Sequence, residues 1–158
     1  MKYDTRIDIA PQQRATLIAI LNQSLADTID LKSQAKQAHW NVKGVNFLSL
    51  HELFDRVATQ LDGYGDTLAE RITALGGYAL GTVRMSAQAS TLPELPLDIK
   101  DGKDYVIALA DRLAVYAKAV RADIDKTANL GDAVTADLYT GIAQEVDKLL
   151  WLLEAHLQ

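Results

Sequence analysis

Five side chains of the kinds that bind metal ions occur at helical spacing within one segment of the chain. They are two histidines and three carboxylates, namely His39, His51, Asp55, Asp66 and Glu70. Residues four apart on a helix lie one above the other on one face, which pairs His51 with Asp55 and Asp66 with Glu70. Imidazole nitrogens and carboxylate oxygens with open positions suit Fe(II), and Zn(II) accepts the same ligands. The pattern therefore predicts a site for iron, with zinc as a competing occupant.

The acidic residues of this segment form a stripe that points away from the apolar face of their helix. At roughly 100° per residue from His51, they fall between about 20° and 100°, and they are Asp55, Asp62, Asp66 and Glu70. Apolar residues such as Leu50, Leu61 and Leu68 cluster instead near −100° on the same rough count. We therefore do not expect the metal ligands to face the interior of their own bundle.

The two halves of the predicted site are also far apart along the helix. The midpoints of the pairs 51/55 and 66/70 lie about 15 residues or roughly 22 Å apart, whereas metal ligands sit about 2 Å from the ion. If two copies of the helix pack antiparallel about a two-fold axis, the His51 end of one lies against the Glu70 end of the other. This creates two equivalent sites per pair. Gly63 and Gly65 leave room for close packing at such an axis.

His39 reaches the same site by a simpler route. It precedes a short turn, and it is about as far from Val45 as His51 is. Residues equally distant from the turn of an antiparallel hairpin lie level, so the two imidazoles are expected to meet at one metal ion. The predicted set is then His39, His51 and Asp55 from one chain with Asp66 and Glu70 from the other.

Four amphipathic segments position these residues. They cover about residues 12–38, 48–75, 103–127 and 132–156. Short connections at 41–46 and 129–131 predict two antiparallel hairpins. The connection at 76–100 is long enough to cross the full height of a bundle, with a short helix expected at 85–90. We therefore predict an all-α, ferritin-like four-helix bundle with one long crossover between helices two and three, in a single domain over residues 1–158.

Composition and charge exclude several classes of protein. The chain has no cysteine, which excludes disulfide frameworks, thiolate metal sites and thiol nucleophiles. The N-terminus does not resemble a signal peptide, and no apolar run approaches the ~20 residues that a membrane span needs. We therefore expect a cytoplasmic protein, with nucleoid association as a further possibility. The formal net charge of −5 favours cations over nucleic acid.

Several motifs resemble those of the Dps family, the miniferritins also called DNA-binding proteins from starved cells. They are HWNVKG from His39, LHELFD from Leu50, DTLAER from Asp66 and the ending TADLYTGIAQEVDKLLWLLEAHLQ. Helix order, crossover and chain length agree with the family across nearly the whole chain. The order and spacing of the five predicted ligands also match the family's ferroxidase ligands, which lie between subunits.

The resemblance implies an enzyme that stores iron. It implies a dodecameric shell of two-fold dimers, with two iron ions at each ferroxidase site. Fe(II) is oxidised there by hydrogen peroxide or oxygen, and ferric oxide is deposited inside, which protects against oxidative stress. By position, Asp132 and Asp137 are candidates for the acidic lining of iron pores, although Asp132 also suits a helix N-cap. Trp40 resembles the family's tryptophan near the site, an electron donor.

Two other functions are open to a chain of this kind. The first is a nucleoid-compacting protein with incidental iron chemistry. Dps proteins that bind DNA often use a long Lys-rich tail, whereas this chain has only Lys2 and Arg6 before its first helix, which counts against DNA binding. The second is a zinc-binding or signalling bundle without oxidation. Trp151 is expected in the core or in an interface, and His156 on the surface.

Overall fold

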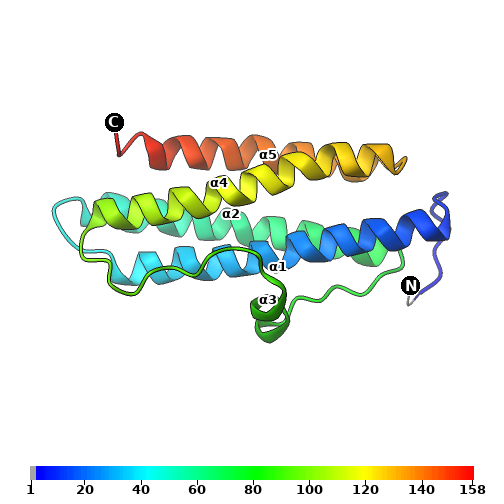
Figure 1. The fold of residues 1–158 in the computed structure, drawn as a ribbon, viewed down its shortest axis with the longest axis horizontal. Helices are drawn as coiled ribbons and strands as arrows, with labels where there is room; N and C mark the ends of the chain where they lie inside the picture. Colours follow the sequence, from blue (N-terminus) through cyan, green and yellow to red (C-terminus); the bar gives the residue numbers. More distant parts are fainter. Residues whose placement is uncertain (1–2) are drawn as a thin grey trace.

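The predicted helical segments form five α-helices in the computed structural model, which describes residues 3–158 (Figure 1). They are α1 (Pro11–Asn41), α2 (Phe47–Ala74), α3 (Val83–Ala89), α4 (Gly102–Asn129) and α5 (Ala133–Glu154). This part of the chain contains no β-strand, so the all-α prediction is confirmed. Lys2, one of the two basic residues noted before α1, lies outside the described residues.

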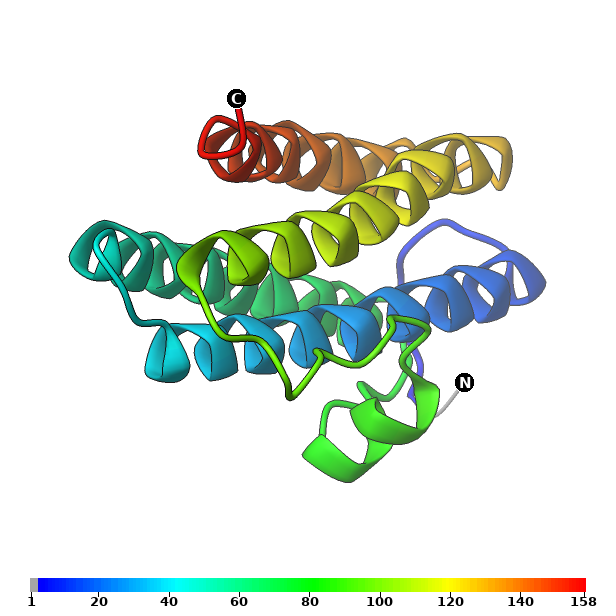
Figure 2. The ribbon, with the colours of Figure 1, turned by 60° about the vertical axis from the view of Figure 1, so that its left-hand side comes forward.

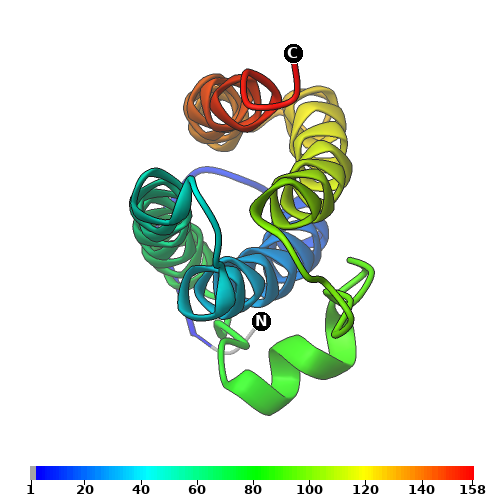
Figure 3. The ribbon, with the colours of Figure 1, turned by 90° about the vertical axis from the view of Figure 1, so that its left-hand side faces the viewer.

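The four long helices form two antiparallel hairpins joined by a crossover. Figure 1 shows the α1–α2 turn at one end of the bundle and the α4–α5 turn at the other. The crossover runs along the outside of the bundle from the end of α2 to the start of α4, and α3 lies on it beside α1 (Figures 2 and 3). This confirms the ferritin-like arrangement with a short helix between helices two and three. Among the described helices, none is both long and apolar enough to span a bilayer.

Capping residues explain where the second hairpin begins and turns. Asp101 caps α4, because its Oδ1 accepts a hydrogen bond of 3.0 Å from the backbone N–H of Asp104. Gly131 follows α4 with a φ of +81°, a left-handed conformation that glycine adopts without the steric cost of a Cβ. Together the two residues fix both ends of α4.

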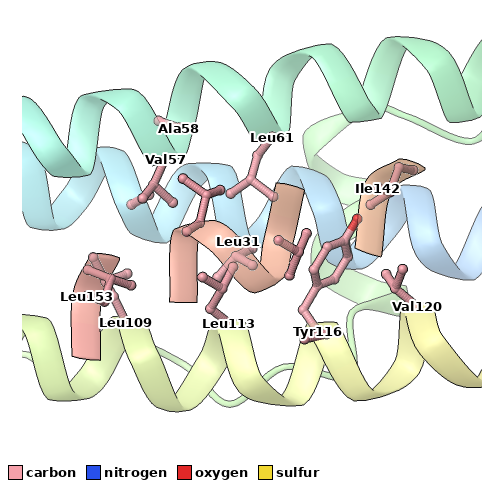
Figure 4. Close-up of a cluster of buried hydrophobic side chains, with 14 of the residues drawn as sticks. Leu31, Val57, Ala58, Leu61, Leu109, Leu113, Tyr116, Val120, Ile142 and Leu153 are labelled. Atoms are coloured by element: carbon pink, nitrogen blue, oxygen red, sulfur yellow. The ribbon is translucent and has the colours of Figure 1, made fainter. Parts of the chain in front are cut away.

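The apolar face of α2 is buried, as the angular count predicts. Leu50, Phe54, Leu61 and Leu68 are almost completely inaccessible to solvent, and each fully buried side chain of this size contributes about 2 kcal/mol of hydrophobic stabilisation. Figure 4 shows Leu61 pointing across the core toward α4. Because this face is held inside, the opposite face with its carboxylates is directed outward.

Buried hydroxyl groups tie α1 to the second hairpin. Thr28 Oγ1 lies 2.7 Å from the hydroxyl of Tyr116 on α4, and Ser24 Oγ lies 2.8 Å from the hydroxyl of Tyr139 on α5. Each pair satisfies polar groups that would otherwise be costly in the core. These contacts hold α1, which carries His39, at a fixed position in the bundle.

Trp151 does not contribute to the core of the single chain. The sequence placed it in the core or in an interface, and its side chain on α5 is 61% exposed. The core placement is therefore wrong, because the residues that α5 turns inward are its neighbours Leu149 and Leu153. A role for Trp151 in an interface stays a prediction.

Candidate metal centre

The α1–α2 hairpin brings His39 and His51 together, as the turn geometry predicts. Their rings stack with centroids 3.7 Å apart and planes inclined by 21°. His39 lies in the last turn of α1 and His51 in the first turns of α2. Both side chains are half-buried, so the stacked pair remains partly open to solvent.

Each histidine is held by the backbone of the other. His39 Nδ1 lies 2.7 Å from the carbonyl oxygen of His51, and His51 Nδ1 lies 2.8 Å from the carbonyl oxygen of His39. A carbonyl oxygen only accepts hydrogen bonds, so both Nδ1 atoms carry the proton in the neutral rings and the lone pair lies on Nε2. A backbone carbonyl that fixes the tautomer and the ring orientation is the usual outer support of a metal-binding histidine.

Asp55 lies one turn beyond His51 and is paired with a lysine. Its Oδ1 accepts a hydrogen bond of 2.7 Å from Lys36 Nζ of α1. This hydrogen bond, reinforced by the positive charge of Lys36, lowers the pKa of Asp55 below its ordinary value. The carboxylate is therefore ionised well into the acidic range, but one of its oxygens is occupied by an ammonium group that a metal ion would have to displace.

Replacing Lys36 by methionine is expected to tighten metal binding. The change removes both the competitor for Asp55 Oδ1 and a positive charge, so Co(II) affinity at neutral pH should rise a few-fold, roughly threefold for a half-exposed pair. A depressed pKa stabilises the fold above the unfolded-state pKa, and this stabilisation is lost as the pH falls through the folded-state pKa. The Lys36→Met variant should therefore be less stable than the wild type at neutral pH, and the difference in the free energy of unfolding should shrink as the pH falls through the folded-state pKa of Asp55.

Lys32→Met is the matched control for this prediction. Lys32 also lies on α1 and pairs with an acidic residue of α2, but its partner is Asp62, which is not a predicted ligand. Titration of both variants with Co(II), followed by absorbance, separates a specific effect on Asp55 from a general change in charge. Equal affinities in the wild type and the Lys36 variant would show that the ammonium group does not compete.

Asp66 and Glu70 are exposed on the outer face of α2, far from the histidines. Because α2 is continuous from Phe47 to Ala74, the separation of roughly 22 Å between the two halves holds in the folded chain. Within residues 3–158, no three His, Asp or Glu side chains come close enough to hold one metal ion. The structure therefore brings together the histidine half of the predicted site and leaves the carboxylate half apart.

A groove of about 790 Å³ lies between α1, α2 and residues 79–83 of the crossover, beside two of the carboxylates. Its lining includes Asp62, Asp66, Gly63 and Gly65. A Cβ added at Gly63 meets no atom within 4 Å, whereas one at Gly65 lies 3.8 Å from Thr28 Cγ2 of α1. Gly65 thus packs against its own chain. The prediction of close packing at a two-fold axis stays open for Gly63.

The remaining predicted residues lie at different depths. Trp40 is 62% exposed, and its ring centroid is 5.8 Å from Lys36 Nζ, so it borders the histidine half of the site. Asp137 is exposed on α5. Asp132 is buried, and it caps α5 by accepting a hydrogen bond of 3.1 Å from the N–H of Thr135. The N-cap alternative is therefore present, and the pore roles of Asp132 and Asp137 stay predictions.

Sequence reasoning missed the two lysines that face the acidic stripe. Lys32 and Lys36 are four residues apart and so share one face of α1. The hairpin rule that pairs His39 with His51 places Lys36 level with a residue next to Asp55. The signal was present in the sequence, but it depended on comparing the two helices rather than reading one.

Comparisons with known proteins agree with the ferritin-like fold. A family model described as a ferritin-like domain matches residues 18–158. Over 156 residues the chain is 44% identical to the DNA protection during starvation protein of Agrobacterium fabrum, a match that covers 99% of this chain and 96% of that relative. Dps from Mycobacterium smegmatis has a TM-score of 0.94 and 29% identity, covering 100% of this chain and 95% of the other. The chain belongs to the Dps family.

A second solved Dps structure bears on the chemistry of the family. The Dps protein from Vibrio cholerae O1 has a TM-score of 0.91 and 28% identity, and the match covers 100% of this chain and 98% of that one. It is described as a member of a broad superfamily of ferritin-like diiron-carboxylate proteins. In this Dps chain, the donors of the histidine pair and of the carboxylate stripe are of the kinds that such chemistry uses.

Proposed function

We propose that this chain oxidises Fe(II) at sites shared between two subunits and stores the ferric product in a homo-oligomeric shell. The observation that carries the proposal is the stacked pair His39 and His51, whose Nδ1 atoms are held by backbone carbonyls so that both Nε2 lone pairs are free for a metal ion. His51 of this pair lies on the same face of α2 as Asp66 and Glu70, toward the opposite end of the helix. A two-fold axis across α2 would join the two halves.

The proposed ligands divide between the two chains. His39, His51 and Asp55 of one subunit would bind the two iron ions together with Asp66 and Glu70 of the other, and Lys36 would release Asp55 as the metal enters. The groove that Asp66 lines leaves this carboxylate accessible to a partner. Zn(II) would compete for the same donors. Each two-fold dimer would hold two such sites. The resemblance to the family implies that these dimers assemble into a dodecamer.

The proposed reaction balances with peroxide as the oxidant. Two ferrous ions each give one electron to one molecule of hydrogen peroxide, the O–O bond breaks, and hydrolysis of the ferric ions releases protons. The chain's own residues hold the two ions at one place, so that both electrons are delivered together and no hydroxyl radical escapes. Trp40 borders the site and is the proposed donor when only one ferrous ion is bound. The relative's name, DNA protection during starvation protein, fits such a role.

The test of this function is a balance of iron and peroxide on the wild-type protein. The expected result is that Fe(II) added without oxygen is oxidised on addition of peroxide at two irons per peroxide, that a spin trap detects little hydroxyl radical, and that the ferric iron elutes with the protein shell. Oxidation no faster than in buffer, or ferric iron that precipitates away from the protein, would contradict the proposal. Oxygen in place of peroxide measures the preferred oxidant.

The test also separates the two alternative functions. A zinc-binding bundle without oxidation would bind metal and leave the rate of Fe(II) oxidation at that of buffer. A nucleoid-compacting protein would retard DNA in a gel at low salt, where electrostatic binding is strongest. With a net charge of −5, we expect no retardation at physiological salt.

A further inference from the structure

A buried ion pair joins the last turn of α2 to the start of α5. Arg71 Nη2 donates to both carboxylate oxygens of Asp132 at 2.9 and 2.8 Å, and Arg71 Nε donates to Thr135 Oγ1 at 2.9 Å. The side chain of Arg71 is 14% exposed and that of Asp132 only 2%. We call these three residues the α2–α5 clasp. Because two nitrogens of one rigid, planar guanidinium donate to two different residues of α5 and its cap, the contact fixes the orientation of Arg71 as well as holding the helices together.

The carboxylate of Asp132 is fully engaged by the clasp and the cap. It accepts hydrogen bonds from Arg71, from the backbone N–H of Thr135 and from the hydroxyl of Thr135. Burial opposes ionisation of this group, but the hydrogen bonds from Thr135 and Arg71 outweigh it and lower the pKa of Asp132. Both oxygens therefore serve the contact between α2 and α5, which gives Asp132 a role within its own subunit.

The carboxylate half of the proposed site has no other local support. The two histidines are held by each other's backbone, and Asp55 is held by Lys36. The side chains of Asp66 and Glu70, by contrast, make no hydrogen bond to any residue of the described chain. Their positions therefore follow from the rotation and axial position of the last turns of α2 alone.

The α2–α5 clasp holds the last turns of α2 in place through Arg71, the residue next to Glu70. Arg71 follows Glu70 directly and lies about 100° further around the helix, so it reaches inward to α5 while Glu70 points outward. The other side-chain hydrogen bond between α2 and α5 in the described chain is a longer one, of 3.3 Å, from Gln60 to Glu145 near the middle of α2. Rotation of the last turns would move both carboxylates relative to the partner subunit's histidines.

We propose that Arg71, Asp132 and Thr135 are positioning residues for the metal site, which hold Asp66 and Glu70 in the orientation that the second subunit requires. The inference rests on the proposed function, because it assumes that these carboxylates bind metal across a subunit interface. It assigns Asp132 to the geometry of the metal site, through Arg71, and does not require it to line a pore.

The test is a titration of the assembled protein with Co(II), which reports metal binding without oxidation. Arg71→Lys keeps the positive charge but loses the guanidinium that contacts both Asp132 and Thr135. Asp132→Asn removes the negative charge but keeps the N-cap, since asparagine caps helices as well as aspartate. Each variant should bind Co(II) roughly tenfold more weakly, the usual result of losing a group that orients a ligand. If the Arg71 variant fails to assemble, Asp132→Asn alone tests the inference. The mass of each variant's shell shows whether it has assembled. Arg112→Lys is the matched control, because Arg112 is buried and contacts α1, α4 and the crossover but not α2.

A double-mutant cycle distinguishes positioning from a general structural role. If Arg71 acts through Glu70, the Arg71→Lys change should weaken Co(II) binding little further in a protein that already carries Glu70→Gln. Losses that multiply in the double variant, or affinities equal to the wild type in both clasp variants, would overturn the inference. If the wild type itself binds no Co(II), the proposed function fails as well, and the two failures are thereby told apart.

Discussion

Replacing His39 and His51 together by alanine is expected to lower the rate of peroxide-dependent Fe(II) oxidation by at least about 100-fold. Loss of a group that merely orients a ligand costs 10- to 100-fold, so loss of the nitrogen donors themselves should cost no less. The two rings stack at the edge of the bundle and are half-buried, so their removal should leave the core and the assembly intact. Stopped-flow absorbance of ferric product measures the rate, and the mass of the shell checks assembly.

His156→Ala is the control for the histidine variant. His156 is exposed beyond the end of α5, is not a predicted ligand, and its Nδ1 lies 2.8 Å from the carbonyl oxygen of Leu152. This third histidine is the remaining one in the chain, and its replacement should change the rate less than twofold. Equal rates in the wild type and the His39, His51 variant would remove the ferroxidase assignment.

Replacing Asp66 and Glu70 together by alanine is expected to lower the rate of peroxide-dependent Fe(II) oxidation as much as the histidine variant does, by at least about 100-fold. Within one chain these carboxylates lie roughly 22 Å along the helix from the histidines. If the site were contained in a single subunit, their loss would therefore leave the rate of oxidation unchanged. In the shared site, each subunit lends them to its partner, and the iron loses two of its oxygen ligands. Both residues are exposed, so the fold should tolerate the change.

Asp62→Ala is the control for the carboxylate variant. Asp62 belongs to the same acidic stripe, and its carboxylate pairs with Lys32 of its own subunit. Its replacement removes the same kind of charge from the same face of α2 and should leave the rate within about twofold, as expected for an exposed pair. Loss of activity in Asp62→Ala but not in the double variant would show that the ligands were assigned to the wrong carboxylates.

The sequence was sufficient for the fold because its local signals agree with one another. The apolar face of the second segment and the short connections at 41–46 and 129–131 all favour the same arrangement of helices. The short helix of the crossover was expected at residues 85–90 and lies at Val83–Ala89, because Thr82 caps it by accepting a hydrogen bond from the N–H of Met85. Boundaries that depend on a cap two residues away are hard to place from periodicity alone.

The meeting of the two histidines was accessible to sequence reasoning, whereas the contact between the end of α2 and the start of α5 was not. The meeting of His39 and His51 followed from the hairpin, because a short antiparallel turn sets the register of its two helices. The Arg71–Asp132 pair joins positions 61 residues apart, and nothing local connects them. Asp132 instead carried the sequence signals of an N-cap and of an acidic pore, and only the packing of α2 against α5 reveals its contact with Arg71.

Co-assembly of two inactive variants tests the shared site most directly. One variant carries His39→Ala and His51→Ala, and the other carries Asp66→Ala and Glu70→Ala, so each is inactive alone. In a mixed two-fold pair, one site contains both defects and the other contains none. Random mixing in equal amounts should therefore restore about one quarter of the wild-type rate, since half of the pairs are mixed and each has one intact site. If dissociated and reassembled mixtures stay as inactive as the separate variants, the metal site does not lie between subunits.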